Sequence, residues 1–195
     1  MDRLIARLEA SLLGRPAVPA GTDGTPARAA VAITFRADRG GPEFLLIRRA
    51  ERAGDPWSGQ VALPGGRWQV EDPSLEGTAL RETLEETGLD IRSRGRVIGA
   101  LDELRPRSPL LPPIVVTPFV AHLESVGPLV LSHEVAAAFW VPWSQLLDPA
   151  MDREAEVTAR GSTWRTPAFH LEGHVVWGMT ERILRSLITR VHEVP

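Results

Sequence analysis

The chain has 195 residues, of which 43% are hydrophobic and 24% are charged, and its formal net charge is −3. This length and apolar content suit one globular domain with a sizeable core, and the small negative charge implies no general affinity for nucleic acid or for an anionic membrane. There is no Cys, which excludes disulfides, thiolate metal sites and cysteine nucleophiles. No stretch approaches the roughly 20 apolar residues of a membrane-spanning helix, and no signal-peptide layout is present. We therefore expect a soluble, cytoplasmic protein.

The N-terminal part of the chain predicts a helix followed by an irregular connection. The apolar residues that recur there at helical spacing are Leu4, Ile5, Leu8, Leu12 and Leu13. They predict a helix over residues 2–13. Residues 14–26 are rich in Gly, Pro, Thr and Asp and are expected to form a loop. We therefore expect residues 1–195 to form a single domain, with residues 1–26 as an N-terminal extension.

Strand patterns and turn signals alternate through the middle of the chain. Residues 28–37 and 43–49 have strand character, and the Gly- and Pro-containing residues 38–42 between them predict a hairpin with a long loop. A short strand is expected at 59–63, ending at the Pro-Gly-Gly of residues 64–66. The later segments with strand character are 96–103, 114–123 and 137–142, with weaker signals at 154–170.

Three further helices are expected. The central one begins at Asp72-Pro73, because Asp caps a helix and Pro fits its first turn, and it runs to about Thr87 with Gly88 as its C-terminal cap. A short helix is expected at 143–148, and a final one at about 175–192. Mixed strands with a strong central helix and a terminal helix predict an α/β sandwich.

Three carboxylates share one face of the central helix. Glu82, Glu85 and Glu86 are spaced i, i+3 and i+4, and Arg81 can relieve only part of their repulsion by reaching Glu85. Hard oxygen ligands of this kind are what Mg²⁺ or Mn²⁺ prefers. Taken alone, such a face is more often simply solvated. The glycines of residues 64–66 favour the metal site, because they let the backbone approach a metal or phosphate closely.

Residues 64–89 resemble the Nudix box, which reads G, five residues, E, seven residues, then R-E-U-x-E-E-x-G-U, where U is apolar. The positions that match the second half are Arg81, Glu82, Glu85, Glu86, Gly88 and Leu89. Thr83 replaces an apolar residue. Gly66 to Arg81 spans 15 positions where the box expects 14. We infer a one-residue insertion, with Asp72 or Glu71 in the early acidic position.

The resemblance implies a Nudix-type α/β/α sandwich with a mixed β-sheet, and an enzyme that cleaves a phosphoanhydride bond in a nucleoside-diphosphate compound. It implies that Glu82, Glu85 and Glu86 hold Mg²⁺ or Mn²⁺, together with a carbonyl of Gly65 or Gly66. The metal would polarise phosphorus and lower the pKa of a bound water. On this reading, Glu82 or Glu85 assists as the base.

The resemblance also suggests supporting residues. Arg81 would orient Glu85 through a charge-assisted pair. A further carboxylate often completes such sites, and the candidates are Asp72 and Glu134, which follows Ser132-His133 in a later loop. An exposed loop residue without such a role is an equal alternative for Glu134.

Residues 45–66 resemble the additional motif of the coenzyme A pyrophosphatase branch of that family. The matching positions are Leu45, Leu46, Arg49, Ala50, Gly59, Pro64, Gly65 and Gly66. Ile47 and Leu63 depart from the motif, and its second Arg falls on Gly54, for which Arg52 is the candidate substitute. The resemblance implies cleavage of coenzyme A or acyl-CoA to 3′,5′-ADP and 4′-phosphopantetheine. Arg49 and Arg52 would bind the 3′-phosphate or the diphosphate, a strand-end salt bridge being the alternative for Arg49.

Aromatic residues flank the glycine turn. Trp57 and Trp68 could stack on an adenine, whereas core packing is the expectation for Trp140, Trp143 and Trp177. The alternatives that stay open are a pyrophosphohydrolase for ADP-ribose, dinucleoside polyphosphates or nucleoside triphosphates, and a non-catalytic nucleotide-binding Nudix module. The expected partner is a small-molecule nucleotide diphosphate, with no nucleic acid and no membrane. The family includes many dimers, so the resemblance also raises a homodimer as a candidate assembly.

Overall fold

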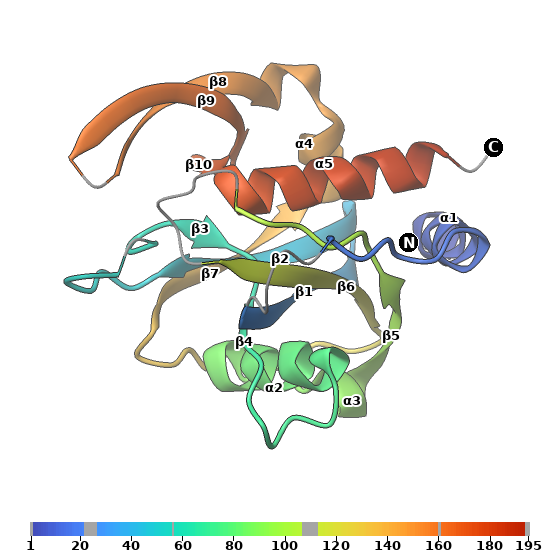
Figure 1. Cartoon of the computed structure of the whole chain (residues 1–195). Helices are drawn as coiled ribbons and strands as arrows, with labels where there is room; N and C mark the ends of the chain where they lie inside the picture. Colours follow the sequence, from blue (N-terminus) through green and yellow to red (C-terminus); the bar gives the residue numbers. More distant parts are fainter. Residues whose placement is uncertain (1, 22–26, 56, 107–112, 160, 194–195) are drawn as a thin grey trace.

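The computed structural model describes residues 2–21, 27–55, 57–106, 113–159 and 161–193 (Figure 1). The strands are β1 Ala27–Asp38, β2 Gly41–Arg49, β3 Val61–Ala62, β4 Gly65–Arg67, β5 Gly95–Ala100, β6 Ile114–Leu123, β7 Val135–Pro142, β8 Asp152–Ala159, β9 Ser162–Leu171 and β10 His174–Trp177. The helices are α1 Asp2–Gly14, α2 Leu75–Thr87, α3 Ile91–Arg94, α4 Trp143–Leu147 and α5 Gly178–His192, with a 3₁₀ turn at Pro149–Met151.

The strands form two sheets. The larger has seven strands in the order β3-β2-β1-β6-β5, with β4 paired to β1 and β7 paired to β2. β1 and β6 run parallel, whereas β1–β2, β2–β7 and β5–β6 are antiparallel, so the sheet is mixed. The smaller sheet has the order β10-β9-β8 and lies beside α5 (Figure 1).

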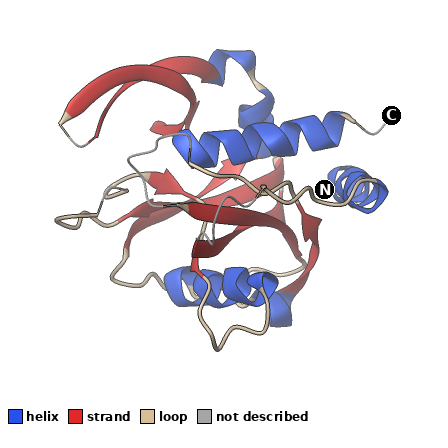
Figure 2. Cartoon of the chain, in the orientation of Figure 1, coloured by secondary structure: helices blue, strands red, loops and turns tan. Residues whose placement is uncertain are grey.

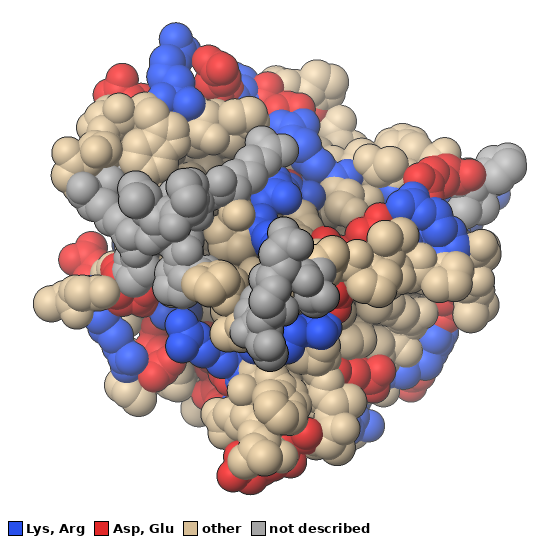
Figure 3. Space-filling model, viewed as in Figure 1, with Lys and Arg blue, Asp and Glu red and all other residues tan. Residues whose placement is uncertain are grey.

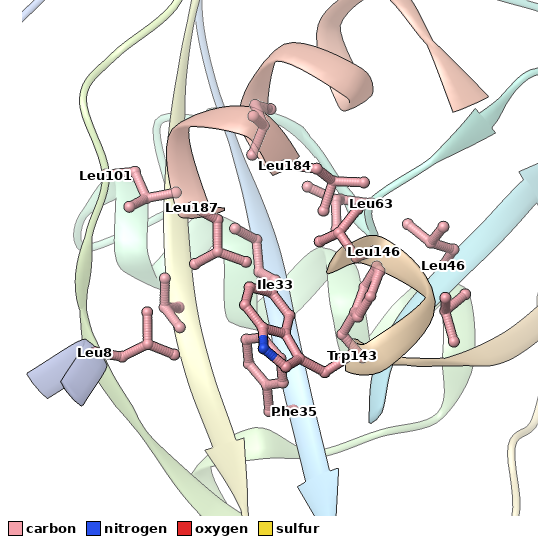
Figure 4. Close-up of a cluster of buried hydrophobic side chains, with 14 of the residues drawn as sticks. Leu8, Ile33, Phe35, Leu46, Leu63, Leu101, Trp143, Leu146, Leu184 and Leu187 are labelled. Carbon is pink, nitrogen blue, oxygen red and sulfur yellow. The ribbon is translucent and has the colours of Figure 1, made fainter. Parts of the chain in front are cut away.

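Helices cover both faces of the larger sheet, with α2 and α3 on one face and α1, α4 and α5 on the other (Figure 2). The α5 face carries the larger core, whose buried side chains include Leu8, Ile33, Phe35, Leu146 and Leu187 (Figure 4). The layers are those of the predicted α/β/α sandwich.

The two faces of β1 differ in side-chain size. Ala30 and Ala32 belong to the core under α2, whereas Ile33 and Phe35 point to the α5 side. Alternation along a strand explains this division. The small side chains leave room for α2 to lie close to β1, which brings its acidic face near β4.

The ends of α2 differ in how well the sequence predicted them. Helix α2 begins at Leu75 rather than at Asp72-Pro73, and its N-cap is Ser74, whose Oγ accepts a hydrogen bond from the Gly77 amide at 3.0 Å. The Asp72 carboxylate is occupied by other donors, described below. The C-terminal prediction is confirmed, because Gly88 is the cap and has the left-handed φ of 72° that favours glycine.

Several other boundaries depart from prediction. The β1–β2 hairpin is tight rather than long, because the strands stay paired as far as Asp38 and Gly41. The strand expected over 96–103 ends at Ala100, and α3 precedes it without having been predicted.

The C-terminal part also differs from prediction. The weak signals at 154–170 correspond to β8 and β9, and the last helix begins only at Gly178, because Val175 and Val176 pair with β9. Of the predicted loop at 14–26, residues 22–26 lie outside the described residues. No helix among the described residues has the length and apolar character needed to cross a membrane.

Candidate active site

Two glycines bring strand β4 against both β1 and α2. Gly65 and Gly66 pair with Val31 and Ala30 of β1. A Cβ at Gly65, whose φ is 154°, would overlap the Ala30 carbonyl, and a Cβ at Gly66 would overlap the carboxyl group of Glu82. The Gly65 position therefore requires glycine, and a side chain at Gly66 would displace the Glu82 carboxylate, so the turn and the acidic helix form one unit.

Glu86 is a buried carboxylate at the centre of this unit. It is 4% exposed, and its Oε2 accepts a hydrogen bond from the Gly65 amide at 2.9 Å. Burial raises the pKa of Glu86 to about 7, the negative charge of Glu82 adds to the rise, and the Gly65 hydrogen bond opposes it. A buried anion with an anionic neighbour is costly without a cation beside it.

Glu82 and Glu85 share a partner but differ in exposure. Arg81 Nη1 lies 2.9 Å from Glu82 Oε1 and 3.0 Å from Glu85 Oε2. Burial raises the pKa of Glu82, and the hydrogen bond from Arg81 opposes that rise. The side chain of Glu85 is 57% exposed. Arg81 thus holds the carboxylates of Glu82 and Glu85 together, and Glu82 acts on Glu86.

Asp72 fixes Arg81 in turn. Its two oxygens accept hydrogen bonds from Arg81 Nε at 2.8 Å and Nη2 at 3.0 Å, and Oδ2 also accepts from the Gln69 amide and the Thr78 hydroxyl. The hydrogen bond from Arg81 holds the pKa of Asp72 well below its usual range despite burial. Asp72 rather than the exposed Glu71 fills the early acidic position. This geometry argues against Asp72 as a metal ligand and assigns it to positioning Arg81.

The loop before β7 brings Glu134 to the C-terminal end of α2. The Ser132 amide donates to the Glu86 carbonyl at 3.1 Å, which ties the loop to the helix. The negative charge of Glu134 contributes to the raised pKa of Glu86, so the two carboxylates are near each other. Glu134 is half-exposed and forms an ion pair with Arg52 Nη1 at 3.0 Å.

Arg49 reaches the same region from the end of β2. Its positive charge opposes the raised pKa of Glu86, which places the guanidinium close to that carboxylate. Arg49 Nη2 forms an ion pair with Asp55 Oδ2 at 2.8 Å, and Arg49 Nε is buried without a hydrogen-bond partner among the described residues. The sequence analysis missed Asp55, whose only signal was its place in the loop after Arg49. The strand-end salt bridge considered for Arg49 is therefore present, and it leaves the buried Nε unused.

The tryptophans divide between core and surface. Trp143 is buried, with its ring centroid 5.7 Å from that of Phe35, as expected for core packing. Trp140 and Trp177 are only half-buried and pack at the edges of the smaller clusters. Trp57 is half-buried, and Trp68 is 44% exposed in the segment after β4.

The carboxylate and carbonyl oxygens of this site suit a hard divalent cation. Among the described residues, no three Asp, Glu or His side chains already meet around one metal position, because Arg81 holds Glu82 and Glu85. The buried Glu86 carboxylate, however, has no cation in direct contact among its described partners, and Glu82 and Gly66 adjoin it. Carboxylate and backbone oxygens are the ligands that Mg²⁺ and Mn²⁺ favour, so these residues fit such an ion.

A family model described as the NUDIX domain matches residues 25–161. The chain belongs to the Nudix family. The family model and the Nudix hydrolase relatives indicate pyrophosphohydrolase activity, as the resemblance of residues 64–89 implied. The one-residue insertion in its Nudix box falls in the segment between β4 and α2, where Asp72 still reaches Arg81.

Curated relatives agree with this assignment. The chain is 34% identical over 152 residues to the uncharacterised Nudix hydrolase NudL of Photorhabdus laumondii, covering 77% of this chain and 78% of that protein. The NudL of Yersinia pestis is 34% identical over 168 residues, covering 86% of this chain and 81% of that protein. A protein of Schizosaccharomyces pombe is 37% identical over 129 residues, covering 64% of this chain but only 39% of its own length.

Solved structures share the Nudix fold. A MutT/nudix family protein from Enterococcus faecalis superposes with a TM-score of 0.57 at 20% identity, covering 89% of this chain and 65% of that chain. The Nudix domain of Shewanella oneidensis NrtR, solved with ADP ribose, has a TM-score of 0.50 at 22% identity, covering 71% of this chain and 86% of that chain. At these identities the likeness shows the fold alone.

Proposed function

We propose that this Nudix hydrolase cleaves a phosphoanhydride bond of a nucleoside-diphosphate compound with Mg²⁺ or Mn²⁺ held by Glu82, Glu85 and Glu86. A carbonyl of Gly65 or Gly66 would complete the ligand set. The observation that carries the proposal is the buried Glu86 carboxylate, hydrogen-bonded to Gly65 and flanked by a second carboxylate. When bound, the cation supplies neutralisation of the diphosphate and acidification of a water molecule.

The chain's own side chains divide the remaining tasks. Glu82 is the better candidate for the base, because its carboxylate is partly desolvated and burial raises its pKa, which makes it a stronger proton acceptor. Glu85 is exposed and ion-paired, which suits a ligand that adjusts its position. Arg81, fixed by Asp72, positions both carboxylates, and Glu134 is the candidate for an additional ligand from the loop before β7.

The proposed substrate is coenzyme A or an acyl-CoA, with 3′,5′-ADP and 4′-phosphopantetheine as products. Arg49 supports this choice, because its buried Nε has no acceptor among the described residues and its guanidinium lies near Glu86, where an anionic group of the substrate would be received. Arg52 adjoins Glu134 and could bind the same anion. Trp57 and Trp68 are accessible enough to stack on the adenine.

A substrate screen tests the proposal. The protein is incubated with coenzyme A, acetyl-CoA, ADP-ribose and diadenosine polyphosphates, with Mg²⁺, with Mn²⁺ and with a chelator, and products are identified by mass spectrometry. We expect metal-dependent release of 3′,5′-ADP and 4′-phosphopantetheine. Metal-dependent cleavage of another compound only would replace the substrate, and absence of any metal-dependent product would favour a non-catalytic nucleotide-binding module.

A further inference from the structure

A recess lies near the end of β2, apart from the carboxylates of α2. It is a cavity of about 750 Å³, a size that suits a small-molecule ligand. One wall comes from the loop between β2 and β3, and the other from the smaller sheet, whose β8–β9 arch stands above that loop in Figure 1. None of the candidate metal ligands is among the described residues that line it.

The cavity opens on the opposite face of β2 from the carboxylates. Leu46 packs in the core on the α5 side, and Arg48, two residues later, lines the cavity. Arg49 instead acts on Glu86. Asp55 joins the two places, because it lines the cavity and forms the ion pair with Arg49. A single extended ligand could therefore reach both sites around the end of β2.

The wall from the smaller sheet combines apolar and polar side chains. Val157, Val175 and Trp177 are its apolar members, beside Glu156, Thr158 and His174, and the Trp177 ring packs edge-on against Trp164 at a centroid distance of 5.7 Å. Ser58 and Gln60 contribute polar groups from the facing loop. This combination suits a chain that carries both methylene groups and amides.

The charges around the cavity disfavour a phosphate. Glu51, Asp55 and Glu156 line it, and Arg48 is the arginine among the described lining residues. On the face seen in Figure 3, basic and acidic side chains are likewise interspersed rather than gathered into one basic field. An uncharged group is therefore a better occupant than a nucleotide phosphate.

Part of this wall lies outside the range that the family model matches. The family model ends at residue 161, whereas Val175 and Trp177 belong to β10. The carboxylates of α2 lie inside the matched range. A wall outside the range that carries the carboxylates is where substrate selection can be built.

We propose that this cavity receives the uncharged, amide-containing arm of a coenzyme A-type substrate while the diphosphate lies at the carboxylates of α2. The inference rests on the proposed function and adds the place where the non-nucleotide half binds. Trp177 and the two valines contact the methylene and thiol or acyl end, and Ser58 and Gln60 bind the amides.

The experiment narrows the cavity with a bulky side chain placed at either of two lining residues, one in β8 and one in β10. Val175→Trp and Thr158→Trp each place a bulky ring at a lining residue, and both positions are exposed enough to accept it without unfolding the core. Val18→Trp, at a 52% exposed valine outside the lining, is the matched control. Binding of pantetheine and of 3′,5′-ADP is measured separately by ligand-observed NMR, and KM is measured for coenzyme A and ADP-ribose.

Both cavity variants are expected to abolish pantetheine binding, retain 3′,5′-ADP binding and raise KM for coenzyme A at least about tenfold, with a much smaller change for ADP-ribose. The control should match the wild type. The inference is overturned if wild-type protein does not bind pantetheine, if both variants still bind it, or if they lose 3′,5′-ADP instead. Failure to hydrolyse any diphosphate would contradict the proposed function. The binding of pantetheine would still be measured, because that measurement does not depend on turnover.

Discussion

Asp72 and Glu86 are buried to similar extents, yet their surroundings are opposite. Asp72 is 8% exposed and receives hydrogen bonds from Arg81, Gln69 and Thr78. Glu86 is 4% exposed and receives one described hydrogen bond, from Gly65. The pKa of Asp72 is lowered mainly by its bond to Arg81, and that of Glu86 is raised mainly by burial. Burial alone thus does not distinguish the two carboxylates; the difference is how many hydrogen-bond donors each one receives.

The largest expected effect is on turnover when Glu86 loses its charge. Glu86→Gln keeps the shape and the Gly65 hydrogen bond but removes a metal-binding oxygen, so kcat should fall by more than about 100-fold, beyond the loss typical of an outer partner of a metal ligand. Glu76→Gln, on an exposed part of the same helix, is the control. Wild-type turnover by Glu86→Gln with Mg²⁺ would remove the proposed metal role.

Asp72→Asn should act first on stability. It leaves Arg81 without its bidentate partner, and we expect a loss of about 3 kcal/mol in the free energy of unfolding, at the lower end for a broken buried pair because Glu82 and Glu85 remain. Urea denaturation checks this, with Glu71→Gln as the exposed neighbour control. If Asp72→Asn unfolds at the wild-type urea concentration and loses only activity, Asp72 belongs to the chemistry instead.

The two carboxylates also predict opposite pH dependences of stability without metal. Because the pKa of Asp72 is lowered, its contribution is present above its unfolded value near 4 and is lost as pH falls. Because the pKa of Glu86 is raised from 4.5 to about 7, the free energy of unfolding should decrease by about 2–3 kcal/mol as pH rises through that interval. Urea titrations in chelator at pH 5 and pH 8 should show this decrease in wild type and not in Glu86→Gln. Parallel profiles would mean that Glu86 is already partnered.

The smallest effect is expected at Arg49. Arg49→Ala removes the buried Nε donor, so KM should rise by a few-fold to about tenfold for coenzyme A and by less for dephospho-coenzyme A, which lacks the 3′-phosphate. The exposed Arg39→Ala is the control. Equal increases for both compounds would assign Arg49 to the diphosphate.

The sequence predicted those features that depend on local spacing. The run from Arg81 to Gly88 specified the acidic helix face and the glycine cap, and both follow from helix geometry. The start of α2 was misplaced because Asp72 was assumed to cap the helix, whereas its oxygens bind Arg81 nine residues later. Contacts of that kind depend on how the chain folds back on itself.

Long-range contacts were the least predictable part. The ion pair of Arg52 with Glu134 and the hydrogen bond from the Ser132 amide to the Glu86 carbonyl join segments whose sequences carry no matching pattern. The smaller sheet was seen only as weak strand signals, because its strands pair mainly with each other and alternate less regularly. The cavity beside it was consequently invisible in the sequence.

The alanines of β1 have a consequence for how this chain tolerates change. Ala30 and Ala32 are fully buried beneath α2, and even one added methylene there would lift the acidic helix away from Gly66. The wall at β10 has no such constraint, since Val175 is 38% exposed. Substitutions at β10 can therefore change which substrate the enzyme accepts. The α2 face of β1 has no space for larger side chains, so it tolerates fewer changes.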